Sequence, residues 1–235
     1  MPVQNEKILA IVIPVFNNWL YTQKTLKYLQ YLPENHLVIV VDNGSQDQTK
    51  RLNSIPCREV IHNETNLGFA KACNIGYAKA VELGYENVMF LNNDIKVIER
   101  HNNWTYPLIG RARGGEIVGP TVGVLDEKLN FVCEGSKFPT SGFGYISGWN
   151  ITSSVKVWNH LILEGEIGPF SSEFGLAYFE DPDLGFRAND MGIRCDVIPV
   201  PVKHYGKVTS KKVGLSELYL HAKPIFMNKW KHKIV

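Results

Sequence analysis

The sequence lacks the features that mark several protein classes. Its four cysteines, Cys57, Cys73, Cys133 and Cys195, form no CxxC pair and have no spacing typical of metal ligands, so we expect reduced thiols. No apolar run is long enough for a membrane span or for the apolar region of a signal peptide. Repeats and low-complexity linkers are also missing. We therefore expect a folded cytoplasmic protein without disulfides.

Charge is nearly balanced overall, at +2, but it is unevenly distributed. Residues 203–235 contain eight lysines and a single acidic residue, Glu217. Apolar residues alternate with lysines in the last part of this segment, which indicates an amphipathic helix interrupted at Pro224. Such a helix either rests on an anionic membrane surface or presents a solvated face. The residues concerned are Leu218, Lys223, Ile225, Phe226, Lys229, Trp230, Lys231 and Lys233.

The first half of the chain alternates apolar runs with helical segments. The expected strands are 8–13, 37–41, 59–62 and 88–91, and the expected helices are 19–32, a short segment after 47, and 69–83. Pro14 should end the first strand, and Asn17 or Asn18 should cap the first helix. This rhythm predicts an α/β fold with a parallel, doubly wound sheet.

Polar residues follow two of these strands directly. Asp42 and Asn43 come after the second strand, and Asn92, Asn93 and Asp94 come after the fourth. Ligands of open α/β sheets bind at the carboxyl ends of the strands, so these side chains should converge there. A carboxylate beside neutral oxygen donors suits a hard divalent cation that also holds substrate phosphates.

The second half is less regular. We expect strands at 117–120 and 194–199, a glycine-rich hairpin or substrate-facing loop at 142–148, a helix at 152–163 and a loop at 202–206. Glu180, Asp181 and Asp183 should begin a helix, where the helix dipole favours negative charge. We expect one domain over 1–235, with a nucleotide-binding half (about 1–100), an acceptor and catalytic half (about 101–206) and a basic loop and helix (207–235).

Five stretches together resemble the family 2 glycosyltransferases of the GT-A fold, particularly the rhamnosyltransferase-like branch. They are IPVFN (13–17), VDNGS (41–45) with Asp47, NLGFA (66–70) with Asn74 and Gly76, LNND (91–94), and FEDPDL (179–184) with Arg187, followed by His204. The resemblance implies a Rossmann-like, mostly parallel sheet flanked by helices, with a mixed acceptor-side half. It implies inverting transfer of a sugar from a UDP- or dTDP-type donor to a hydroxyl of a glycan or lipid-linked acceptor, in polysaccharide or glycoconjugate synthesis.

The resemblance also implies roles on the donor side. Pro14 and Val15 would line the base pocket, and Asp42 would accept a hydrogen bond from N3 of uracil or thymine. Asp94 and His204 would hold Mn²⁺ or Mg²⁺, with the imidazole favouring manganese. Asn92 stands where the family has its first aspartate and would lie near the ribose. The remaining residues expected at the nucleotide sugar are Asn17, Asn43, Lys71, Asn74 and Asn93.

On the catalytic side, inversion requires one carboxylate opposite the leaving group to accept the proton of the attacking hydroxyl. The resemblance assigns this role to Asp181, and Glu180 would hold hydroxyls of the acceptor or donor. The acceptor side would include Gly148, Trp149, Asp183 and Arg187, and Arg187 also suits an ion pair with a neighbouring acid. Lys207, Lys211 and Lys212 would close over the diphosphate.

Each motif alone also has a structural interpretation. Residues 42–44 suit a turn, 92–94 a helix cap and 180–183 a helix start, and an isolated histidine such as His204 is often structural. A sugar-phosphate nucleotidyltransferase is an alternative function, but the sequence after the first strand has neither the glycine nor the lysine of a phosphate loop. A third alternative is a binding module, or a module that acts on nucleic acid; this alternative would account for the basic tail but not for the other motifs. We expect a cytoplasmic enzyme, with membrane contact at the inner face through that tail, and no nucleic-acid partner.

Overall fold

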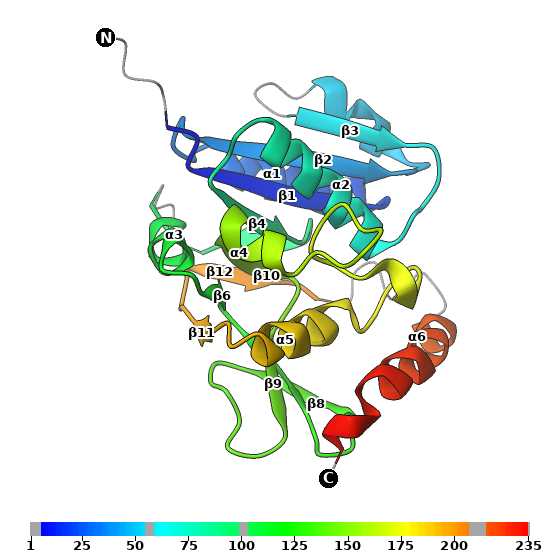
Figure 1. Ribbon diagram of the computed structural model, residues 1–235. Coiled ribbons are helices and arrows are strands. Elements are labelled where there is room, and N and C mark those ends of the chain that lie inside the picture. The colour runs from blue at the N-terminus through cyan, green and yellow to red at the C-terminus, as the bar shows by residue number, and fades with distance from the viewer. Residues whose placement is uncertain (1–5, 55–58, 99–102, 207–214, 235) are drawn as a thin grey trace.

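A seven-stranded sheet forms the centre of the computed structural model, which describes residues 6–54, 59–98, 103–206 and 215–234 (Figure 1). The strand order is β11-β6-β10-β4-β1-β2-β3. All neighbouring strands run parallel except β10, which is antiparallel to both β4 and β6. The strands are β1 (Leu9–Val15), β2 (His36–Asn43), β3 (Glu59–Asn63), β4 (Asn87–Leu91), β6 (Ile117–Gly119), β10 (Asn150–Ser154) and β11 (Cys195–Val197). The expected α/β fold with a mostly parallel sheet is confirmed.

Helices cover both faces of this sheet. They are α1 (Trp19–Leu29), α2 (Phe69–Glu82), α3 (Tyr106–Arg113), α4 (Val155–His160), α5 (Glu180–Asp190) and α6 (Leu215–Trp230), with 3₁₀ helices at Gln48–Ser54, Ser172–Phe174 and Lys231–Lys233. Successive residues of β1 belong to different cores: Ala10 and Val12 pack with α2 and α4, whereas Leu9 and Ile11 pack with α1 and α3. A strand that is buried on both faces has a continuous run of apolar residues, and this run allows β1 to be predicted from the sequence.

Two small sheets extend the second half. The strand β5 (Ile95–Val97) pairs antiparallel with β12 (Val202–His204). The strand β7 (Val122–Leu125) lies between β8 (Phe131–Gly135) and β9 (Phe143–Ile146). The predicted hairpin or loop at 142–148 is therefore largely a strand, and the predicted loop at 202–206 contains one.

Other local predictions were wrong at their boundaries. Pro14 lies inside β1, beyond Val12, where the pairing with β4 ends, so its missing N–H is tolerated. The helix predicted at 152–163 begins only at Val155, where the Ser154 hydroxyl caps it. The preceding residues form β10, because Ile151 and Thr152 favour a strand and β4 offers a partner.

The basic tail packs against the protein. Helix α6, near the C-terminus in Figure 1, continues through Pro224. Its buried residues Phe226 and Trp230 pack with Phe186 of α5. Lysines of the segment contact protein oxygens: Lys223 binds Asn130, Lys229 binds Glu173 and Asp183, and Lys233 binds Asp190. The apolar face predicted to meet a membrane is thus occupied inside the fold.

Two further predictions concern cysteines and membrane spans. Cys73, Cys133 and Cys195 are free thiols, as expected, and Cys57 lies outside the described residues. Within the described ranges, no helix combines the length and the apolar character needed to cross a membrane. Lys207, Lys211 and Lys212, predicted to close over a diphosphate, also lie outside the described residues.

Candidate functional site

The predicted site residues gather at the carboxyl edge of the parallel strands. Strands β2 and β4 flank β1 and run in the same direction, so Asp42 and the segment 92–94 leave the sheet at one edge. The β5–β12 pair brings His204 there, opposite Ile95. The backbone carbonyl of Asp94 accepts a hydrogen bond from the Tyr205 N–H, at 2.9 Å, which fixes the pairing. The sequence did not predict strand β12, and that strand explains why a histidine 110 residues away meets Asp94.

Asp94 and His204 form a pair of potential metal ligands. Nε2 of His204 lies 2.9 Å from Oδ1 of Asp94 and 3.1 Å from the amide nitrogen of Asn92. One ring nitrogen cannot both donate to the carboxylate and accept from the amide. The single lone pair of Nε2 can accept from Asn92 or bind a cation that Asp94 also holds, but it cannot do both. This arrangement suits a cation between the oxygen and the nitrogen.

The donor set fits Mn²⁺ or Mg²⁺. It offers one carboxylate oxygen and one imidazole nitrogen, and Asp94 is buried. The described part of the chain contains no group of three or more histidine, cysteine, aspartate or glutamate side chains that could hold a metal. The other coordination positions would therefore fall to substrate phosphates and water, which is usual for Mg²⁺ at phosphate sites.

Asp181 lies across a short segment from this pair. It is the second residue of α5, is half-buried, and its Oδ2 accepts a hydrogen bond from the Gly148 N–H at 2.9 Å. Burial raises the pKa of Asp181 to about 6; the Gly148 bond opposes this shift, and the negative charge of Glu134 adds to it. A carboxylate with this pKa is ionised at neutral pH and is still basic enough to accept a proton from a hydroxyl.

Glu134 and Glu180 complete the acidic side of the site. Glu134, on β8, accepts a hydrogen bond from the Ser147 hydroxyl at 2.6 Å, and no local sequence pattern pointed to it. Glu180 is buried, and burial is the main cause that raises its pKa to about 8. Glu180 is thus a protonated acid at neutral pH. Its Oε1 is buried and has no hydrogen-bond partner among the described residues.

Asp42 is held in place at the proposed base pocket. Its Oδ1 accepts the Ser45 N–H at 3.0 Å, and its Oδ2 lies 3.0 Å from Nδ1 of His62. His62 faces Asp42 across the β2–β3 pair and was not predicted from the sequence. Asn17 joins the neighbouring loops, because its N–H donates to the Ser45 hydroxyl and its Oδ1 accepts from Gln46. Pro14 is half-buried at the end of β1, whereas Val15 is buried in the core.

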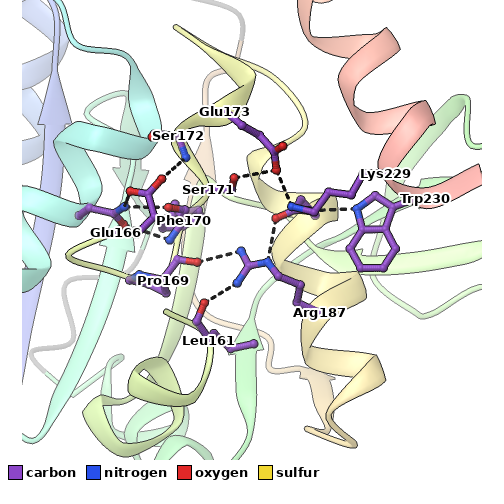
Figure 2. Close-up of polar contacts among 12 residues, drawn as sticks. Leu161, Glu166, Pro169, Phe170, Ser171, Ser172, Glu173, Arg187, Lys229 and Trp230 are labelled. Atoms are coloured by element: carbon purple, nitrogen blue, oxygen red, sulfur yellow. Dashed lines mark hydrogen bonds and ion pairs between the residues drawn. The ribbon is translucent and has the colours of Figure 1, made fainter. Parts of the chain in front are cut away.

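Three asparagines predicted to contact substrate are instead engaged with the protein. Asn43 bonds Asn63, Asn66, Leu67 and Gly68, so it braces the loop before α2. Asn74 bonds Phe170 and Glu166, and Figure 2 shows the loop that carries these two residues beside α2. Asn93 donates to the Thr22 hydroxyl at 2.9 Å. Their amides position loops around the site, whereas Lys71, in the first turn of α2, is exposed.

Asp183 and Arg187 form a buried network and do not line an acceptor surface (Figure 2). The Arg187 guanidinium donates to Oδ2 of Asp183 at 2.8 Å and to the carbonyls of Leu161 and Pro169. Oδ1 of Asp183 accepts from the Trp230 indole at 3.0 Å. The predicted pairing of Arg187 with a neighbouring acid is confirmed, and the burial of both side chains argues against an acceptor-side role.

Gly148 and Trp149 were also predicted on the acceptor side. Trp149 is buried and stacks on the His204 ring, with centroids 5.2 Å apart and an interplanar angle of 10°. Gly148 directly contacts Asp181. The structure therefore puts both residues between the Asp94–His204 pair and the candidate base, Asp181.

Comparison with known proteins supports the fold. Residues 10–97 match glycosyl transferase family 2. The mannosyltransferase PcManGT of Pyrobaculum calidifontis, solved with GDP-Man and Mn²⁺, shares 16% identity at a TM-score of 0.57, over 84% of this chain and 57% of that one. S. aureus TarS, residues 1–349 with UDP-GlcNAc, shares 18% identity at a TM-score of 0.50, over 81% of this chain and 56% of that one. At these identities the likeness shows the fold.

This chain spans little more than half the length of these two solved structures. A search of curated proteins found no match.

Proposed function

We propose that this chain, whose residues 10–97 match glycosyl transferase family 2, is an inverting, metal-dependent glycosyltransferase. It would move a sugar from a nucleotide diphosphate sugar to a hydroxyl of a glycan or lipid-linked acceptor. The observation that carries the proposal is the convergence of the Asp94–His204 pair and Asp181 on the same short segment at the carboxyl edge of the sheet. The single-domain organisation over residues 1–235 is part of the proposal.

The metal side of the site would manage the leaving group. A bound Mn²⁺ or Mg²⁺ acts as a Lewis acid that neutralises the departing diphosphate. Asp94 and His204 would hold it through Oδ1 and Nε2, the metal would replace the contact between Asn92 and Nε2, and Asn92 would then lie near the ribose. The Mn²⁺ in PcManGT supports a divalent metal here.

Asp181 would act as the general base. Its Oδ2 is held by the Gly148 N–H, which leaves Oδ1 to accept the proton of the acceptor hydroxyl as that oxygen attacks the anomeric carbon. The bond from the anomeric carbon to the diphosphate breaks on the opposite face, so the configuration inverts. Glu180, protonated because burial raises its pKa to about 8, would donate a hydrogen bond to a sugar hydroxyl.

We propose a pyrimidine nucleotide donor of the UDP or dTDP type. Asp42 presents a carboxylate fixed by Ser45 and His62, which suits an imino N–H. Among the other predicted donor residues, Lys71 is exposed and Pro14, Asn17 and Asn92 are half-buried. PcManGT was solved with a guanine nucleotide and TarS with a uracil nucleotide, so a direct comparison of bases is required.

A thermal-shift experiment tests the donor site. UDP, dTDP and GDP are each added with Mn²⁺, Mg²⁺ or chelator. A ligand at 100 times its Kd stabilises by about 2.7 kcal/mol, which corresponds to a shift of roughly 5–10 °C for a chain of this size. We expect this shift with a pyrimidine diphosphate and metal, and its loss in Asp94→Ala.

The control is Glu127→Ala, which removes an exposed carboxylate far from the site in the chain and should keep the full shift. A metal-dependent shift of normal size in Asp94→Ala would contradict the donor-site assignment. A larger shift with GDP than with UDP or dTDP would contradict the pyrimidine assignment.

A further inference from the structure

Residues 147–149, Ser-Gly-Trp, form one segment that touches both sides of the site; we name it the Ser-Gly-Trp bridge. We propose that Trp149 is the positioning residue of the metal histidine, and that the Ser-Gly-Trp bridge joins the metal pair to the catalytic base. The inference rests on the proposed function, since it takes Asp94 and His204 as the metal ligands and Asp181 as the base.

The Trp149 ring restrains His204 from one side. The two rings are nearly parallel and offset, an arrangement that aromatic rings favour. A buried indole against one face of the imidazole limits its rotation, so Nε2 stays directed at Asp94. Metal-binding histidines depend on such outer partners for their orientation.

The Trp149 ring is itself fixed. Its indole N–H donates to the Thr121 hydroxyl at 2.7 Å. Its backbone carbonyl accepts the Asn92 N–H at 2.8 Å, which ties the bridge to the residue that bonds His204. Thr121 also holds the first residue of the bridge, because its carbonyl accepts the Ser147 N–H at 3.0 Å.

The other end of the bridge contacts the base. The Gly148 N–H donates to Asp181, and a Cβ added at Gly148 would lie only 3.2 Å from the Cβ of Asp181. A side chain there would push the carboxylate away, so glycine permits the short approach. A displacement of Trp149 would therefore move the donor to Asp181 as well as the support of His204.

The test measures Mn²⁺ affinity, not turnover. Mn²⁺ is titrated into each protein in the presence of UDP and followed by electron paramagnetic resonance of the free ion. Removal of the ring in Trp149→Leu should weaken Mn²⁺ binding at least tenfold, in the range seen for outer-sphere partners of metal ligands. Trp149→Phe keeps an aromatic face but, like Thr121→Val, lacks the hydrogen bond between the indole and the Thr121 hydroxyl, so its loss should be about threefold or slightly more and smaller than that of Trp149→Leu.

Trp104→Leu is the matched control. Trp104 is buried to the same degree as Trp149, at 5% exposure each, and it packs in the core with α1 and α3. It should unfold at a lower temperature but bind Mn²⁺ normally once folded. Thr121→Val removes only the partner of the indole N–H, so it provides a second variant if Trp149→Leu does not fold; we expect a loss of about threefold or more.

The outcomes separate the inference from the proposed function. If the wild type binds no Mn²⁺ with UDP, the metal site itself is wrong. If His204→Ala loses Mn²⁺ while Trp149→Leu, or Thr121→Val where the leucine variant is unfolded, binds it as the wild type does, the positioning role of Trp149 is wrong and the metal site stands. Equal losses in Trp149→Leu and Trp104→Leu would also overturn the positioning role, because the effect would then be general destabilisation.

Discussion

At the scale of single residues, the ionisation of Asp181 should control the pH dependence of transfer. Burial raises its pKa to about 6, and only the ionised form can accept a proton. We therefore expect kcat/KM to rise with pH by about tenfold per unit below this value and to level off above it. The profile is measured with saturating metal, and Asp181→Asn should bind donor but lose at least 100-fold in turnover.

Glu134 provides a sharper version of this experiment. Its charge is one cause of the raised pKa of Asp181, so Glu134→Gln should move the acid limb to lower pH. Glu127→Gln neutralises an exposed carboxylate four residues before the start of β8 and should leave the limb in place. An acid limb that stays fixed in Glu134→Gln, or moves to higher pH, would argue against Asp181 as the titrating base.

The sequence identified carboxylates better than amides. Asp42 and Asp94 could be predicted because each directly follows an apolar strand, and Asp181 because it lies in the FEDPDL motif. The hydrogen bonds of Asn43, Asn74 and Asn93 could not be predicted because their partners come from other loops and elements: Asn74 binds Phe170, 96 residues away. His62 and Glu134 could not be found, since only strand pairing and side-chain packing bring them to Asp42 and Asp181.

At the scale of elements, helix α5 carries the base, and its buried Asp183–Arg187 pair connects it to the carbonyls of Leu161 and Pro169 and to the Trp230 indole. Asp183→Ala would leave the Arg187 guanidinium buried without its counter-ion and would remove the acceptor of the Trp230 indole. Breaking a buried pair in this way costs about 3–5 kcal/mol. We expect a loss of this size in the free energy of unfolding, measured by urea titration.

Glu82→Ala is the comparison, because it breaks an ion pair with Lys79 on the surface of α2. The Glu82 side chain is 67% exposed, so its removal should cost no more than about 1 kcal/mol. Similar losses in the two variants would show that the Asp183 network does not anchor α5.

The elements that were predicted wrongly share a cause. Residues 150–154 and 202–204 are short segments whose conformation is set by partners, β4 for the first and β5 for the second. Their own sequences, NITSS and VKH, carry little periodicity. The longer parallel strands and α2 were predictable because burial imposes a pattern on five or more residues.

At the scale of the whole molecule, the two predicted halves share one core. Phe90 of β4 packs against Trp158 of α4 and Phe170, with centroids 5.5 and 4.8 Å apart, and β10 lies between β4 and β6 in the main sheet. Separation of the halves would expose these rings and leave the β10-facing edge of β4 without a neighbour. We therefore expect a single cooperative unfolding transition, with calorimetric and van't Hoff enthalpies equal at about 160 kcal/mol near 60 °C.

The fragment 1–98 tests the same argument from the other side. It contains the parallel strands β1 to β4, yet it lacks Trp158 and β10, so Phe90 and one edge of β4 would face water. We expect circular dichroism to show this fragment unfolded, while a mixture with residues 99–235 regains structure. A fragment that folds alone, or two separate transitions in the intact chain, would instead mean that the nucleotide-binding half is an independent domain onto which the catalytic half docks.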